Sequence, residues 1–124
     1  MSKTATLRKL IYTKLQTVPG NTYHRTASED AAYPYKTFEL SSVAFVENRD
    51  DMELEVDLWD RSSDPKRIEE LADQIERLFM GANIPQPPIY PTFFRENRYN
   101  VEDPDKNLQH IQLRFLVQLY ETEE

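Results

Sequence analysis

The amino-acid sequence predicts an α+β fold, a single domain in which a mostly antiparallel sheet of four to five strands carries two main amphipathic helices on one face. Within residues 52–81 the hydrophobic period changes from two to 3.6, which predicts a strand followed by a helix. Residues 107–120 alternate in the manner of a second long strand. The chain has 124 residues, which suits one domain, so we expect residues 1–124 to form it, with 1–4 and 121–124 frayed.

The first expected element is a helix near residues 5–17. Apolar residues recur there at helical spacing, namely Leu7, Leu10, Ile11 and Leu15. Pro19-Gly20-Asn21 supplies the terminator. The polar positions Arg8, Lys9 and Lys14 make this end of the chain basic while the rest is acidic. This asymmetry either steers head-to-tail contacts between copies or belongs to a solvated face.

A β-rich region follows. Residues 22–26 are a short β-prone run, expected to be an edge strand or an extended segment, and residues 27–32 are a polar connection. Pro34 predicts a strand start, with the strand running over residues 35–46 and a possible bulge at Ser41-Ser42. Residues 47–51 are the expected polar hairpin connection to a strand that begins at Met52, and the two strands are expected to pair antiparallel.

The strand from Met52 is half-buried in this prediction. Its apolar side chains are Met52, Leu54, Val56 and Leu58, and its other face carries Glu53, Glu55, Asp57 and Trp59. Asp64 is the expected cap of a helix whose first turn begins at Pro65, and Gly81 is its stop. One helical face is apolar, formed by Ile68, Leu71, Ala72, Ile75, Leu78 and Phe79.

The remaining chain contains a proline-rich segment and two strands. Residues 82–91 hold four prolines, too many for a helix or a central strand, so we expect them to run extended over the surface as a connector or a proline-rich partner motif. Residues 92–101 and 107–120 are then two β segments joined by a turn at 102–105. The last strand projects five apolar side chains to one face, which predicts an interior position in the sheet.

Composition removes several classes of function. A net charge of −7 opposes binding to a phosphate backbone, so sequence-specific nucleic-acid binding is not expected. Two glycines in the whole chain exclude a glycine-rich phosphate loop, and the absence of cysteine excludes disulfides and thiolate metal sites. No stretch approaches the roughly 18 apolar residues of a membrane span, so no membrane partner is expected.

The search for chemistry leaves few candidates. His24 and His110 lie on different β segments, and no catalytic triad, cofactor site or metal site is visible. The carboxylates Glu53, Glu55 and Asp57 form either a solvated strand face, a charged surface repeated around an oligomeric ring, or a catalytic or hard-metal set that lacks a second convergent group. Trp59 belongs either to a protein interface or beneath a neighbouring loop.

Four segments together carry a resemblance to a known family. They are the helix LRKLIYTKL, the strand start AAYPYKTFEL, the strand-turn-helix EVDLWDRSSDPKRIEELADQIERLF and the final strand LQHIQLRFLVQLYE. In order and spacing, over nearly the whole chain, they resemble the tail-completion or tail-terminator (head-tail joining) family of long-tailed phages, which prophages also carry. The resemblance implies a non-enzymatic virion protein that forms a ring, typically a hexamer, at the head-proximal end of the tail and stops tail-tube polymerisation. The proline-rich stretch 83–91 departs from the family's pattern.

The implied partners are further copies of the chain, the tail tube protein and a head connector or neck protein, with assembly in the host cytoplasm and DNA passing through the ring. The candidate interface or lumen residues are Glu53, Glu55, Asp57, Trp59, Glu47, Arg49, Asp50, Pro87 and Tyr90. Other hypotheses remain open at this point. They are another neck component such as a head-closure or connector protein, a small enzyme or ligand-binding module using the Glu53, Glu55 and Asp57 face with His110, and a regulatory binder of another protein's helix or strand.

Overall fold

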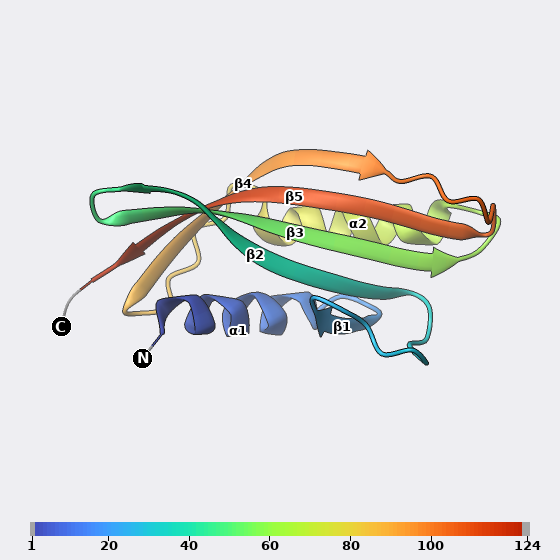
Figure 1. Cartoon of the computed structure of the whole chain (residues 1–124), viewed down its shortest axis with the longest axis horizontal. Helices are drawn as coiled ribbons and strands as arrows, with labels where there is room; N and C mark the ends of the chain where they lie inside the picture. The colour runs from blue at the N-terminus through green and yellow to red at the C-terminus, as the bar shows by residue number, and fades with distance from the viewer. Residues whose placement is uncertain (1, 123–124) are drawn as a thin grey trace.

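The computed structural model describes residues 2–122, which form two helices and five strands in one domain (Figure 1). The helices are α1 (Lys3–Leu15) and α2 (Lys66–Phe79). The strands are β1 (Asn21–His24), β2 (Tyr35–Val46), β3 (Arg49–Arg61), β4 (Ile89–Asn100) and β5 (Leu108–Glu121). They form one sheet in the order β1-β2-β3-β5-β4. The predicted α+β class is confirmed.

Strand pairing agrees with the sequence-based prediction in most respects. The pairs β2–β3, β3–β5 and β4–β5 are antiparallel, and β5 lies between two partners, as its apolar face predicts. The edge strand β1 pairs parallel with β2, which the sequence did not indicate. The register of β2 against β3 shifts between Ser42 and Ala44, close to the bulge expected at Ser41-Ser42.

Both helices cover the same face of the sheet. α2 packs against β3, β5 and β4, whereas α1 packs against β1 and β4. Their apolar stripes meet the inward residues of the long strands, among them Leu54, Val56, Leu113 and Phe115, all of which are fully buried. The core therefore lies between the sheet and the helices, and the opposite face of the sheet carries no helix (Figure 1). We call this opposite face the open face.

The ends of the helices follow from local chemistry. Ser2 Oγ accepts a hydrogen bond from Ala5 N, which caps α1 two residues before the expected start, so residues 3 and 4 are helical and not frayed. α1 also ends at Leu15, before the predicted residue 17. The N-cap of α2 is Pro65 and not Asp64 as predicted, although Asp64 Oδ1 accepts from Lys66 N at 3.0 Å. Gly81 follows α2 with a φ of +65°.

Two further boundaries differ from the prediction. The hairpin turn comprises only Glu47 and Asn48, because Arg49, Asp50 and Asp51 already pair with β2. The strand β4 begins at Ile89, so Pro91 lies inside a strand. A proline is tolerated there because β4 is an edge strand, and its ladder to β5 does not need the missing N–H. Opposite the start of β4, β5 extends to Glu121, which was expected to be frayed.

The proline-rich segment does not run free over the surface. Ile84 N donates to Pro91 O at 3.1 Å and Phe93 N donates to Ala82 O at 2.8 Å, so the segment lies along the outer edge of β4. Gln86 and Ile89 form a bridge around Pro87 and Pro88. No helix among residues 2–122 is long and apolar enough to cross a membrane.

Candidate functional site

The predicted acidic face lies on the open face of the sheet. Glu53, Glu55, Asp57 and Trp59 project there because their strand neighbours Leu54, Val56 and Leu58 are fully buried on the other side. β3 is the middle strand of the sheet, so side chains of β2 and β5 flank these residues and leave them half-buried. The structure thus brings together four of the predicted residues in one row.

An aromatic row crosses the open face at one end. The Trp59 ring stacks on the imidazole of His110 with ring centroids 3.6 Å apart, and on Tyr35 at 6.2 Å. Tyr35 in turn contacts Tyr33 at 5.4 Å and Tyr23 at 6.1 Å. Trp59 therefore packs against neighbours on the sheet surface itself and not beneath a loop. The strand register explains this position, because Tyr35 and His110 are directly opposite Trp59 on the adjacent strands.

The carboxylates are engaged in a network with β5. Asp57 Oδ1 lies 2.7 Å from His110 Nε2 and accepts from Gln112 Nε2 at 3.2 Å. Arg114 pairs with Glu55 at 3.0 Å and also with Glu53. The charge of one guanidinium thus offsets part of the charge of two carboxylates, so the row is less negative than the sequence of β3 suggests.

The crowding of carboxylates perturbs their protonation. Burial, a hydrogen bond with Asp57 and the charge of Asp57 raise the pKa of Glu55 to about 7, against the opposing charge of Arg114. Burial also acts to raise the pKa of Asp57, but hydrogen bonds from His110, Glu55 and Gln112 outweigh it and lower that pKa. Near neutral pH the row therefore exchanges a proton at Glu55 while Asp57 remains ionised.

The hairpin residues that were predicted as one site lie on two faces. Arg49 pairs with Asp51 through Nε at 2.7 Å and Nη2 at 3.1 Å. Both residues alternate in step with Glu53 along β3, so they lie on the open face. Asp50 points to the helix side, is buried, and pairs with Lys3 of α1. Its carboxylate is therefore buried and paired within the chain, which argues against the predicted role of Asp50 as an interface or lumen residue. Glu47 is exposed in the turn with a φ of +54°.

Pro87 and Tyr90 lie apart from the acidic row. Pro87 is exposed in the turn before β4, and Tyr90 pairs in register with Tyr120 at the end of β5. Because Tyr120 and Arg49 are also opposite each other, Tyr90 belongs to the end of the sheet that carries the hairpin. The nine predicted residues thus occupy the centre of the open face, the hairpin and the start of β4.

The sequence-based prediction missed an apolar patch at the end of the β2–β3 hairpin. Val43, Phe45 and Val46 are 61%, 79% and 49% exposed. The available signal was the run Val43-Ala44-Phe45-Val46 directly before a polar turn, where a half-buried strand would alternate.

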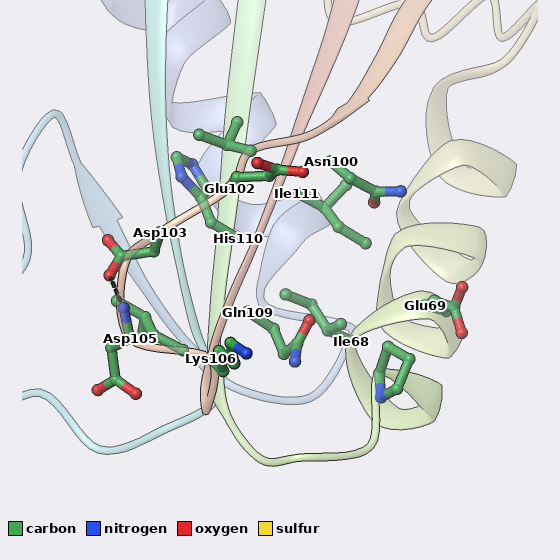
Figure 2. Close-up of a pocket in the computed structure, with 13 residues that line it drawn as sticks. Ile68, Glu69, Asn100, Glu102, Asp103, Asp105, Lys106, Gln109, His110 and Ile111 are labelled. Atoms are coloured by element: carbon green, nitrogen blue, oxygen red, sulfur yellow. Dashed lines mark hydrogen bonds between the residues drawn. The ribbon is translucent and has the colours of Figure 1, made fainter.

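A separate cavity of about 540 Å³ lies at the opposite end of the molecule, between the start of α2 and the β4–β5 loop (Figure 2). Figure 2 shows acidic side chains around it, those of Glu69, Glu102, Asp103 and Asp105, and Lys106 among them. Asp103 Oδ1 accepts from Asp105 N at 2.9 Å, and Asp105 pairs with Arg61 at 2.7 Å. These contacts order the loop. Within the described part of the chain, no three histidine or acidic side chains are placed to hold a metal ion.

Comparison with known proteins finds a match in structure but none in sequence. No protein-family model matches the chain, and no curated protein matches it in sequence. Among solved structures, it is similar to a chain of the virion of a native gene transfer agent particle, with a TM-score of 0.67. The match covers 90% of this chain and 84% of that chain. The two chains share a fold. Their sequences are 9% identical, so the arrangement of helices and strands is what they have in common.

Proposed function

We propose that this protein is a structural component of a virion, a tail-terminator-like subunit that forms a ring at the head-proximal end of a tail tube. The observation that carries the proposal is the likeness in fold to a chain of a phage-like virion particle over nine-tenths of this chain. The order of sequence segments that resembles the tail-terminator family supports it independently of the fold. In this role the ring stops tube polymerisation and joins the tail to a head connector.

The electrostatics of the open face are compatible with a surface in such a ring. Its three carboxylates on β3 outnumber the one guanidinium of Arg114 that pairs with them, so a ring of copies repeats a partly neutralised but still acidic surface around its axis. Like charge keeps a DNA strand from adhering to the wall through which it passes. The aromatic row beside these carboxylates offers large rigid side chains of the type enriched in protein interfaces.

Binding to tail tubes is the direct test. Tubes polymerised from the major tail protein of the same gene cluster are incubated with the protein and imaged in negative stain. The proposal expects a cap at one tube end and shorter tubes when the protein is present during polymerisation. Tubes of unaltered length with bare ends would contradict the proposal.

A pair of charge-reversal variants tests the part played by the open face. Glu39→Lys places a positive charge on β2 opposite Glu55, at a side chain that is 52% exposed, and Glu70→Lys makes the same change on the outer side of α2. We expect Glu39→Lys to weaken capping and Glu70→Lys to leave it unchanged. Equal capping of tail tubes by the two variants would exclude the open face as the surface that acts in capping.

Another neck component is the nearest alternative, because a head-closure or connector protein presents the same requirements of size and assembly. Binding to the head connector without binding to tube ends would favour it. The rival of a small ligand-binding module draws on the contact between Asp57 and His110. However, the hollow on the open face, about 560 Å³, is lined by Glu53, Gln112 and Arg114 with residues of β4, and the cavity at the start of α2 is bordered by His110 without Asp57. Neither of these two cavities is lined by both members of that contact.

A further inference from the structure

The end of the β2–β3 hairpin is an apolar surface without cover. We call residues 43–47 the hairpin tip. Phe45 is 79% exposed, the largest exposure among the large apolar side chains of residues 2–122, whereas Val46, 49% exposed, is opposite Arg49 and so points to the open face. In Figure 1 the hairpin extends past the ends of both helices. A phenylalanine exposed to this extent at the end of a hairpin is a candidate for contact with another molecule.

The register explains why Phe45 is uncovered. Phe45 stands opposite Asp50, whose carboxylate pairs with Lys3 at the start of α1. Phe45 therefore points to the side of the sheet that the helices cover, but at a position beyond the start of α1. The core face of the sheet continues past the helices there, and no helix of residues 2–122 covers Phe45.

The same chain presents a groove of suitable character. It lies on α1 beside the turn before β4, has a volume of about 510 Å³, and is lined by Ala5, Lys9, Leu10 and Thr13 together with Gln86. We call it the α1 groove. Leu10 supplies an apolar floor, and Lys9 supplies a positive charge at an exposed position. Lys9 has no ion-pair partner among residues 2–122.

We propose that the hairpin tip of one copy inserts Phe45 into the α1 groove of the next copy. Charge complementarity selects a second copy as the occupant: Glu47 adjoins Phe45 at the tip and has no ion-pair partner in the described chain, while Lys9 borders the groove. Arg8, also exposed, adds to the positive charge of this helix. The inference deepens the proposed ring by naming its subunit contact, and so rests on the proposed function.

The contact is heterologous, because the tip and the groove are different parts of the chain. Such a contact repeats from copy to copy and closes into a ring when the rotation between copies permits. It also hides both the apolar tip and the unpaired charges of Glu47 and Lys9, which leaves the open face free to line the ring or meet another partner.

Cysteine cross-linking tests the contact cleanly, because the chain has no cysteine of its own. A Phe45→Cys chain and a Thr13→Cys chain are mixed at high concentration and oxidised with copper phenanthroline. We expect a disulfide-linked heterodimer in the mixture, little homodimer from either chain alone, and a ladder of oligomers from a chain with both substitutions. The matched control pairs Phe45→Cys with Glu70→Cys on α2, which we expect to remain monomeric.

Charge reversal provides a second measurement that leaves the fold intact, since both side chains are exposed. Glu47→Lys in the Phe45→Cys chain is expected to reduce heterodimer yield about two- to fivefold, as for a partly exposed ion pair, and Lys9→Glu in the Thr13→Cys chain is expected to restore it. Absence of the heterodimer, or Phe45→Cys chains that link equally well to each other, overturns the proposed contact.

These outcomes are distinguishable from failure of the virion role. Capped tail tubes without the Phe45–Thr13 cross-link leave the virion role standing and refute this subunit contact. The cross-link with tubes left bare establishes the contact and refutes the tail-terminator role.

Discussion

Replacing Glu55 with Gln is the perturbation that tests the electrostatics of the open face. The pKa of Glu55 is about 7 in the folded protein and 4.5 in its ordinary environment. The folded state therefore holds a proton that the unfolded state has lost between these two values. The contribution of Glu55 to the free energy of unfolding is therefore complete below pH 4.5. It falls as the pH rises from 4.5 to about 7 and is absent at higher pH.

The magnitude follows from the size of the shift. A change from 4.5 to about 7 corresponds to at most roughly 3 kcal/mol of unfolding free energy. The Glu55 side chain is 31% exposed and Arg114 lies 3.0 Å away, so solvent screening reduces the expected effect to about 1–2 kcal/mol. Gln resembles the protonated carboxyl in shape and charge. Glu55→Gln should therefore raise stability by about 1–2 kcal/mol at pH 8 and change it little at pH 4.

Urea unfolding followed by circular dichroism at pH 4, 6 and 8 measures this difference. Glu70→Gln on the exposed side of α2 is the matched control and should follow the wild type at all three pH values. A stability difference for Glu55→Gln that is the same at pH 4 and pH 8 would refute the reasoning, because a titrating carboxyl must act through pH. Asp57 does not confuse the result, since its lowered pKa acts below its ordinary value of 3.8.

Two further predictions concern the core. Lys36 is fully buried, and its ammonium donates to the carbonyls of Val18, Pro19 and Gly20 at 3.3, 3.1 and 2.5 Å. Lys36→Met should lower the free energy of unfolding by about 1–3 kcal/mol at pH 7, because these carbonyls lose their donor. Burial lowers the pKa of Lys36 to about 8, so wild-type stability should rise between pH 8 and 10.5, and a Lys36→Met variant that shows the same rise would contradict this assignment. Phe115 packs beside Phe79 with ring centroids 5.5 Å apart, so Phe115→Ala should lower the free energy of unfolding in urea by about 3–5 kcal/mol. Phe94 is 41% exposed, so Phe94→Ala should lower it by under about 1 kcal/mol. Similar losses for the two variants would contradict the assignment of Phe115 to the core.

Much of the fold was predictable because strong local patterns agree with it. Strand β2 has the predicted bounds, and the alternation in β3 and β5 assigns their buried faces correctly. The helix α2 was predictable from its apolar spacing, although its N-cap is Pro65 and not the predicted Asp64. Boundaries at Lys3, Arg49 and Ile89 were wrong, because pairing and capping extend elements beyond their apolar patterns.

The candidate site was predictable only in part. Periodicity alone places Glu53, Glu55, Asp57 and Trp59 on one face, since side chains of a strand alternate. It does not say that Asp57 meets His110, because that contact joins residues 53 positions apart. The exposed Phe45 depends likewise on where the helices end relative to the hairpin.

The sequence by itself determined the class of fold, the buried face of each long strand and the absence of cysteine chemistry, because these depend on local period and composition. The tertiary structure alone decided the order of the strands, the parallel pairing of β1, the network that partly neutralises the acidic row, and the uncovered hairpin tip. The physical reason is that contacts between distant segments set the strand register and the position of the helices along the sheet. A change of one residue in register moves every side chain of a strand to the other face.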